Sequence, residues 1–510
     1  MKYITERPLL LSLIAGVLIG FSYIPGPIFL SWIAFIPLFY LLTSKASLKK
    51  IILGTWITQF LLTLIGFHWI GYTISEFGRM PAWIGYAGLV GFCCFANTHF
   101  VLAAIIYRKT VTRHTSLSLI WFSLLFVTLE IFYPMIFPWT MGYTWMPSFF
   151  PIKQLADTVG VYGLSIITVL INLWLYTLIQ AKEKKKLAII GLGVFVFLNI
   201  LGFIKEQMWQ GSDRTLKALV VQANIGNLLK YKAEKEGKFQ TEIINEYISM
   251  TMEALKDKKV DLIVWPETAM PIFLNLGRMD SAHTKRIADI TRIYNAEIFT
   301  GTYSYQGEDI FNSIAYISNQ GLVTHLYSKS ILLAFGEYFP GTEHSKYFKD
   351  LVEKIIPAVS HFARGPGPSV FKTQPNFIVG PQVCYEGLDT FYNQKIVKQG
   401  ANILINVTND SWFGSTFEPH QHMHMTLSRA IEYRRPMIRS TNTGISAAIT
   451  ASGKILEESP INEKWTKIYE IPLIVQPGQS IYGLTASLQS YLLLLLTALL
   501  GILGRKKEYF

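Results

Sequence analysis

The sequence predicts a multi-pass α-helical membrane domain joined to an α/β domain. Its 510 residues are 51% hydrophobic and 14% aromatic but only 16% charged, which is too apolar for an ordinary soluble protein. Long apolar runs fill most of the first 204 residues and the end of the chain, whereas 205–483 carries frequent charges. The net charge of +12 does not predict a nucleic-acid partner, because the basic residues gather in short loops between apolar runs.

The membrane domain is predicted from stretches that approach the roughly 20 apolar residues needed to cross a bilayer. Eight stretches qualify: 8–24, 27–44, 51–74, 82–107, 116–136, 160–180, 187–204 and 484–504. The first two are expected to form a helical hairpin rather than a signal peptide, because no small-residue cleavage site precedes Pro25 and six further spans follow.

The basic residues predict the orientation. Fifteen of them fall on one side of the predicted spans: Lys2, Arg7, Lys45, Lys49, Lys50, Arg108, Lys109, Arg113, Lys182, Lys184, Lys185, Lys186, Arg505, Lys506 and Lys507. The opposite short loops hold Arg79 and Lys153. Because basic loops stay in the cytoplasm, both termini are expected there, and 205–483 is expected outside the cytoplasm.

Strand-like and helix-like runs alternate in 205–483. The expected strands are KALVVQANI, VDLIVWPET, AEIFTGTYSY, FNSIAYIS, NFIVGPQVCYE and ANILINVTND. The expected helices include FQTEIINEYISMTMEALKD and HMTLSRAIEYRRPMIRS. This alternation predicts sheets covered by helices.

Cys384 is the only cysteine of 205–483, since Cys93 and Cys94 lie together in an apolar segment. A free thiol outside the cytoplasm is exposed to oxidation unless it has a use. It is either a small buried hydrophobic residue or a nucleophile. A nucleophilic cysteine needs a base and an oxyanion donor.

Two further strand ends offer such groups. Pro266 should end the run DLIVW, so that Glu267 projects from the sheet edge, where shielding beside Trp265 would raise its pKa. Lys329 lies in the apolar stretch HLYSKSILLAFGEYFP. It either snorkels to solvent or holds an oxyanion and depresses the thiol pKa. Glu337 follows it by eight residues.

The order VWPET, YSKSILLAFGEYFP, GPQVCYEG and NVTNDSWFG resembles the carbon–nitrogen hydrolase (nitrilase) superfamily, whose domains are αββα sandwiches with a Glu–Lys–Cys triad. The eight spans, with FGEYFP, CYE and RAIEYRRPMIRSTNTGIS, more narrowly resemble the apolipoprotein N-acyltransferase family. That resemblance implies a division into 1–204 with seven spans, a nitrilase-like catalytic domain at 205–483, and 484–510 with the last span and a cytoplasmic tail.

The resemblance implies a role for each matching residue. Glu267 matches the general base, Lys329 the oxyanion-stabilising lysine and Cys384 the nucleophile that carries an acyl thioester. The supporting positions are Glu337, Tyr385 and Glu386. Tyr231 stands where the family often has tryptophan, which puts any role for an indole N–H in doubt.

The implied enzyme moves an acyl chain from a phospholipid to the α-amine of the diacylglyceryl-modified N-terminal cysteine of an apolipoprotein. It would need no metal or organic cofactor and would act as a monomer in the bacterial inner membrane, with its catalytic domain in the periplasm. A membrane-tethered amidase would use the same triad and release the acyl group to water. A transporter with an external domain is the non-enzyme alternative, but charges within the spans are sparse.

The histidines of EPHQHMHM, at 420, 422 and 424, suggest a zinc site. Their spacing of two would place them on one side of a strand, whereas the residues that follow indicate a helix. A surface turn is therefore predicted here rather than a metal site.

Overall fold

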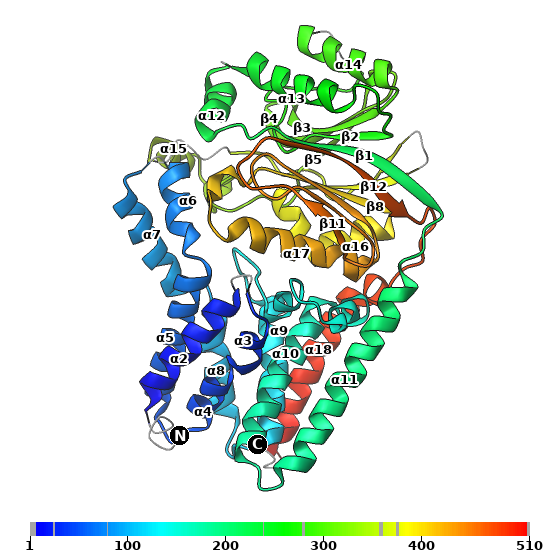
Figure 1. Ribbon diagram of the computed structural model, residues 1–510. Helices are drawn as coiled ribbons and strands as arrows, with labels where there is room; N and C mark the ends of the chain where they lie inside the picture. The colour runs from blue at the N-terminus through cyan, green and yellow to red at the C-terminus, as the bar shows by residue number, and fades with distance from the viewer. Residues whose placement is uncertain are drawn as a thin grey trace. The chain divides into compact units, whose positions relative to one another are not determined.

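The computed structural model describes residues 7–23, 26–78, 80–237, 239–277, 281–355, 361–373 and 377–506. Lys2, Arg79 and Lys507 lie outside the described residues. The chain forms two compact units (Figure 1). Unit 1 comprises 1–74, 81–208 and 485–510, and unit 2 comprises 75–80 and 209–484.

Unit 1 is helical. Its helices are α2 (Pro8–Tyr23), α3 (Phe29–Ile33), α4 (Ile36–Thr43), α5 (Leu48–Gly66), α6 (Trp69–Gly78, whose last turn belongs to unit 2), α7 (Ala82–Phe95), α8 (His99–Thr110), α9 (Ser116–Phe132), α10 (Ala156–Gln180), α11 (Lys184–Met208) and α18 (Ile481–Lys506, whose first turn belongs to unit 2). Short 3-10 helices at Met141–Trp145 and Pro151–Leu155 precede α10.

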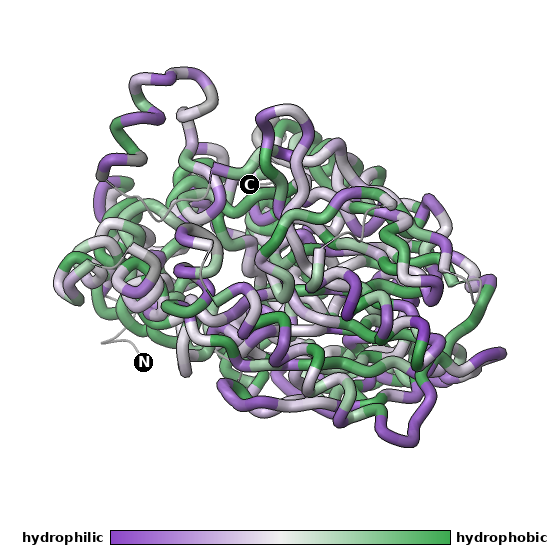
Figure 2. Tube along the Cα trace, turned by 90° about the horizontal axis from the view of Figure 1, so that it is seen from above, coloured by the Kyte–Doolittle hydropathy of each residue, from purple (hydrophilic) through white to green (hydrophobic). Residues whose placement is uncertain are grey.

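Several of these helices suit a membrane. Five helical segments of the described chain are long and apolar enough to cross one: Leu48–Gly66, Ala82–Thr110, Pro151–Gln180, Lys184–Met208 and Ile481–Gly504. Three shorter apolar segments, Pro8–Tyr23, Phe29–Thr43 and Ser116–Phe132, occupy the remaining predicted positions. Figure 2 colours the trace by hydropathy, and hydrophobic stretches recur along it.

Helix α11 shows most directly what surrounds unit 1. Gly202 alone is buried among its residues, whereas apolar side chains such as Ile189 and Leu192 are 71% and 58% exposed. Water would oppose such an exposed apolar surface, so a lipid environment accounts for it. Unit 1 therefore belongs to a membrane protein.

Unit 2 contains two six-stranded sheets. The first has the order β12-β1-β2-β3-β4-β5 and the second β11-β10-β9-β8-β7-β6. The strands are β1 (Arg214–Gln222), β2 (Leu262–Val264), β3 (Glu297–Gln306), β4 (Asp309–Ile317), β5 (Val323–Ser328), β6 (Phe371–Lys372), β7 (Ile378–Val383), β8 (Ile403–Thr408), β9 (Met437–Thr441), β10 (Ala447–Ile449), β11 (Ile455–Glu458) and β12 (Trp465–Leu473). All six expected strands are confirmed.

Helices cover the outer face of each sheet (Figure 1). The helices of unit 2 are α12 (Asn227–Glu236), α13 (Gln240–Ala254), α14 (Ala282–Tyr294), α15 (Lys346–Ile355), α16 (Thr390–Lys398) and α17 (Glu418–Tyr433), with 3-10 turns at Thr342–His344, Cys384–Leu388 and Asp410–Phe413. Residues such as Ile244 of α13 and Ile287 of α14 join one apolar core with Ile263 of β2. The expected α/β layering is therefore confirmed.

One expected helix is partly wrong. The run HMTLSRAIEYRRPMIRS was expected to be helical throughout, but α17 ends at Tyr433 and β9 begins at Met437. Arg434 takes a left-handed conformation with φ 53°, and Pro436 cannot supply the amide hydrogen that a helix would need. The β-branched Ile438 then pairs with Ile405 in the sheet.

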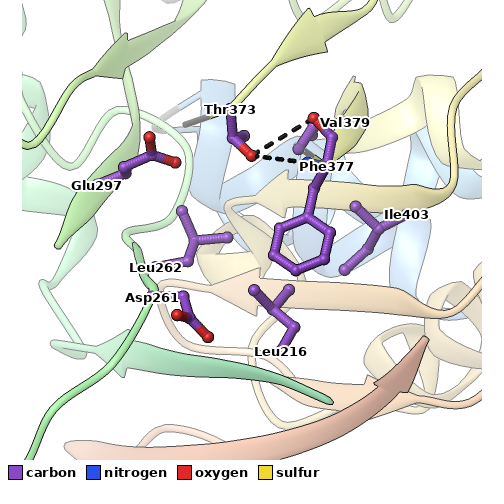
Figure 3. A pocket seen from close by; sticks show the side chains of 8 residues that line it. All are labelled: Leu216, Asp261, Leu262, Glu297, Thr373, Phe377, Val379 and Ile403. Carbon is purple, nitrogen blue, oxygen red and sulfur yellow. Dashed lines mark hydrogen bonds between the residues drawn. The ribbon is translucent and has the colours of Figure 1, made fainter. Parts of the chain in front are cut away.

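A narrow pocket lies between the two sheets (Figure 3). It is lined by Leu216, Asp261, Leu262, Glu297, Thr373, Phe377, Val379 and Ile403. All of these residues except Thr373 stand at or near the amino ends of strands, and the Thr373 hydroxyl accepts a hydrogen bond from the Phe377 backbone N–H at 3.2 Å. The pocket is therefore a packing gap at the end of the sheets opposite the loops that follow β2 and β7.

Gly301 of β3 lies directly against the loop that follows β2. A Cβ atom at this position would lie 2.4 Å from the Thr268 N atom and 2.5 Å from the Glu267 Cα atom. Both contacts are to backbone, which cannot rotate away, so even alanine would displace this loop.

We expect Gly301→Ala to destabilise unit 2 by about 1–3 kcal/mol, which for a unit of this size should lower its melting temperature by roughly 2–5 °C. Thermal unfolding of the full chain in detergent measures this change. Gly211→Ala is the matched control, because no atom lies within 4 Å of its Cβ position. Equal melting temperatures for the two variants would show that the loop tolerates the displacement.

Candidate active site

Three strand ends bring the candidate residues of unit 2 together. Strands β1, β2 and β3 are parallel, and β5 runs in the same direction as β3 because each pairs antiparallel with β4. The residues that follow the carboxyl ends of β2 and β5 therefore lie at the same end of the first sheet. These residues include Glu267 and Lys329, while Cys384 directly follows β7 of the second sheet.

The Lys329 ammonium lies between two carboxylates. Its Nζ atom is 2.7 Å from Glu337 Oε2 and 3.9 Å from Glu267 Oε1, and the side chain is 1% exposed. Lys329 therefore does not snorkel to solvent. Its ammonium also interacts electrostatically with Cys384, so the four sequence-predicted residues form one cluster.

Asn312 was not predicted, yet it links the two carboxylates. Its Nδ2 donates to Glu267 Oε1 at 2.7 Å and to Glu337 Oε1 at 2.9 Å. The side chain is buried within β4. An asparagine among the apolar residues of FNSIAYIS was the available signal, because a buried amide needs polar partners.

The backbone is strained at two points of this site. Cys384 and Thr268, the residue after Glu267, both have φ 50°, a left-handed conformation that residues with a side chain rarely adopt. Such strain persists only where the surroundings hold it, and it gathers at functional sites. One restraint is Asn406, whose Nδ2 donates to the Cys384 carbonyl at 3.2 Å.

The expected rise in the Glu267 pKa is confirmed. Burial raises the pKa of this carboxyl, the Lys329 ammonium opposes the rise, and the Glu337 carboxylate adds to it, which leaves the pKa at about 7. Trp265, which was expected to shield this carboxyl, packs against Tyr247 in the core between the first sheet and its helices. A carboxyl with this pKa can both accept and return a proton near neutral pH.

The expected depression of the thiol pKa is wrong. Burial raises the pKa of Cys384 and the Glu267 carboxylate raises it further, and these effects outweigh the opposing influence of Lys329. The Cys384 side chain is nevertheless partly exposed. For Lys329, burial lowers the pKa, but Glu337, Cys384 and Glu267 raise it well above its usual value. The resting site therefore holds a neutral thiol beside a permanent cation.

Glu386 ties the turn at Cys384 to the segment at Lys329. Its Oε1 atom accepts hydrogen bonds from the Tyr327 hydroxyl at 2.6 Å and from the backbone N–H groups of Ser330 at 2.7 Å and Ile331 at 3.2 Å. Its Oε2 atom accepts from the Val383 N–H at 2.9 Å. Burial raises its pKa, whereas the hydrogen bond from Tyr327 lowers it. Glu386 therefore supports the segments at Cys384 and Lys329 by accepting hydrogen bonds from the backbone N–H groups beside them.

Of two other expected residues, the structure describes the side chain of Tyr385 but not that of Tyr231. Tyr385 is partly exposed beside Cys384. Tyr231 lies in α12, but its side chain is outside the described residues.

Lys230 was also missed by the sequence interpretation. It lies on α12, is 2% exposed, and donates to the Glu267 carbonyl at 3.0 Å and the Thr268 hydroxyl at 2.8 Å. Lysine is rarely buried without partners, but nothing in the letters NIGNLLKYK distinguishes Lys230 from Lys232. Its partners became visible only in the fold.

The prediction for the three histidines is wrong. They lie in the first turns of α17 rather than in a surface turn, and His422 is buried. His422 Nδ1 is 3.1 Å from Asp410 Oδ1 and 3.7 Å from Glu418 Oε1. The sequence could not show that the 3-10 turn Asp410–Phe413 supplies Asp410 to this cluster.

The Asp410, Glu418 and His422 ligand atoms lie within 4.8 Å of one another, close enough for a metal ion. However, the Arg439 guanidinium already contacts Asp410 Oδ2 at 2.9 Å. Burial would raise the Asp410 pKa, but Arg439 and His422 bring it down to about 2. A divalent cation would face this fixed positive charge. The cluster is better explained as a buried ion-pair network.

Comparisons with known proteins agree with this geometry. The carbon-nitrogen hydrolase family model matches residues 217–475, and the model for the apolipoprotein N-acyltransferase N-terminal domain matches residues 15–174. The first match contains Glu267, Lys329 and Cys384, so unit 2 has the nitrilase-like fold.

Similar curated proteins extend along most of the chain. The apolipoprotein N-acyltransferase of Bdellovibrio bacteriovorus is 39% identical over 475 residues, covering 89% of this chain and 86% of the relative. That of Geobacter metallireducens is 30% identical over 497 residues, covering 94% and 92%. With both domains matched and the identity spread over nearly its whole length, the chain belongs to the apolipoprotein N-acyltransferase family.

Proposed function

We propose that this chain moves an acyl chain from a phospholipid to the α-amine of the diacylglyceryl-modified N-terminal cysteine of an apolipoprotein, through a thioester on Cys384. Family membership supports lipoprotein N-acylation. The observation that carries the mechanism is that Glu267, with a pKa of about 7, and the buried Lys329 ammonium both interact with the Cys384 thiol. Neither a metal nor an organic cofactor enters these steps.

The first half-reaction forms the thioester. Glu267 takes the thiol proton while the Cys384 sulfur attacks the ester carbonyl, and Lys329 stabilises the oxyanion. When the oxyanion collapses, the carbon–oxygen bond breaks and Glu267 returns the proton to the departing alkoxide. The products are an acyl-enzyme and a lysophospholipid.

The second half-reaction transfers the acyl chain. The lipoprotein amine attacks the thioester carbonyl, Lys329 again stabilises the oxyanion, and Glu267 takes a proton from the nitrogen. Collapse breaks the carbon–sulfur bond, and the proton passes to the sulfur, which restores the neutral thiol. Glu337 and Asn312 hold the Lys329 and Glu267 side chains in place throughout.

The membrane domain gives access to the phospholipid. We assign eight spans, seven within 1–204 and one in 484–510, with 205–483 as the periplasmic catalytic domain. The five long and three shorter apolar segments support this count, and the basic loops support cytoplasmic termini. The protein would act as a monomer in the bacterial inner membrane.

A membrane-tethered amidase would have the same cluster, but it would release the acyl group to water. The match of residues 15–174 to the acyltransferase N-terminal domain favours transfer to an amine.

Phospholipid alone should load one acyl chain onto Cys384 and release one lysophospholipid, because the first half-reaction does not need the acceptor. Intact-mass measurement and cleavage by neutral hydroxylamine would identify the thioester. Cys384→Ala should abolish loading, and Cys384→Ser should nearly abolish it, because a hydroxyl is far less acidic than a thiol. Acylation of a lipoprotein peptide by Cys384→Ala would overturn the covalent mechanism.

Glu386→Gln should slow thioester formation by about 100-fold, because a glutamine amide would turn N–H groups toward donors that now meet carboxylate oxygens, at a cost of about 3 kcal/mol. Initial rates of lysophospholipid release measure the effect. Glu297→Gln is the matched control: Glu297 is also buried and accepts a tyrosine hydroxyl, but it lies at the far end of the sheet. Equal rates for both variants would show that Glu386 does not position the nucleophile.

A topology reporter inserted at Gln240 should respond as a periplasmic one, whereas a reporter fused after Phe510 should respond as cytoplasmic. The reason is the bias of basic residues toward one set of loops. The reporters alkaline phosphatase and green fluorescent protein distinguish the two compartments. A cytoplasmic response at Gln240 would contradict the proposed orientation.

A further inference from the structure

Lys230 is held by the backbone of the residue that we propose as the base. Its Nζ atom donates to the Glu267 carbonyl oxygen at 3.0 Å and to the Thr268 hydroxyl at 2.8 Å. Both acceptors belong to the short segment that leaves β2. The ammonium therefore fixes this segment from the side of α12.

The location of Lys230 carries an energetic cost. The side chain is 2% exposed, and moving an ammonium out of water costs several kcal/mol even after the protein relaxes. A buried methionine or leucine would fill a similar volume without that cost. The segment after β2 includes Thr268 with φ 50°, a conformation that also needs external support.

We propose that Lys230 is a positioning residue, which holds the Glu267–Thr268 segment in its strained conformation and supplies a second buried positive charge that keeps Glu267 available as the base. The proposal rests on the role of Glu267 in the proposed function. It adds a residue outside the triad, Glu337 and the residues beside Cys384.

The charges around Glu267 show why a second cation matters. Burial and the Glu337 carboxylate raise the pKa of Glu267, whereas Lys329, the Asn312 hydrogen bond and Lys230 lower it. Lys329 is in direct contact with Glu337 at 2.7 Å, so that carboxylate offsets much of its charge. Without Lys230, Glu267 would stay protonated to higher pH.

The direction of the pH effect follows. Protonated Glu267 cannot accept the thiol proton, so thioester formation falls as the pH drops through the Glu267 pKa. Removing Lys230 raises that pKa, so this acidic limb should move to higher pH. A shift of about one unit from a pKa of about 7 would lower the rate at pH 7 by about fivefold, and the rate should partly recover at higher pH.

The test measures initial rates of lysophospholipid release by the full chain in detergent, with phospholipid alone, from about pH 5.5 to about pH 9. Lys230→Met should move the acidic limb upward, whereas Lys230→Arg keeps the charge and should leave the limb in place while lowering the rate at every pH. Lys232→Met is the matched control, because this partly exposed lysine on the same helix lies over the Phe239 ring instead.

If the Lys230→Met protein loses rate uniformly while the acidic limb of its pH profile stays at the wild-type pH, the proposal is overturned and Lys230 is a purely structural residue. If Lys230→Met does not accumulate, Lys230→Gln replaces it, because glutamine keeps a hydrogen-bond donor and removes the charge: a limb moved to higher pH supports the charge role, and an unmoved limb contradicts it. Glu267→Gln separates this outcome from failure of the proposed function, since a Glu267→Gln protein that still loads would show that Glu267 is not the base.

Discussion

The contact between the Lys329 ammonium and the Glu337 carboxylate is the interaction on which the site depends. Burial alone would lower the pKa of Lys329, and a neutral amine could not stabilise an oxyanion. Glu337 keeps Lys329 charged, and Asn312 then joins Glu337 to Glu267. The Glu337 carboxylate consequently balances the charge of Lys329 as well as lying beside the triad.

The sequence predicted the parts of the fold that depend on local patterns. Apolar runs located the strands that carry Glu267 and Cys384, because a buried strand needs such residues whatever its neighbours are. The helix α17 was wrongly predicted to continue to residue 440. The helical spacing of the apolar residues does not show that Arg434 and Pro436 end the helix.

The site was predictable as a set of residue types but not as a network. Motif order identified Glu267, Lys329 and Cys384, yet Asn312 and Lys230 act through contacts between segments far apart in the chain. The thiol pKa shows the same limit: a nearby lysine suggested a lowered value, but burial has the larger effect. Burial is a property of the fold, so sequence spacing could not decide between the two.

The raised thiol pKa explains why a single cysteine can serve in the proposed periplasmic location. Oxidants and disulfides react with thiolates far faster than with thiols, so a resting thiol that stays protonated is protected while it waits for substrate. Glu267 would generate the nucleophile only as the carbon–sulfur bond forms. The stable cation at Lys329 then stabilises charge at the reacting carbonyl rather than a standing thiolate. The arrangement limits oxidation without giving up nucleophilic catalysis, because proton removal is coupled to attack.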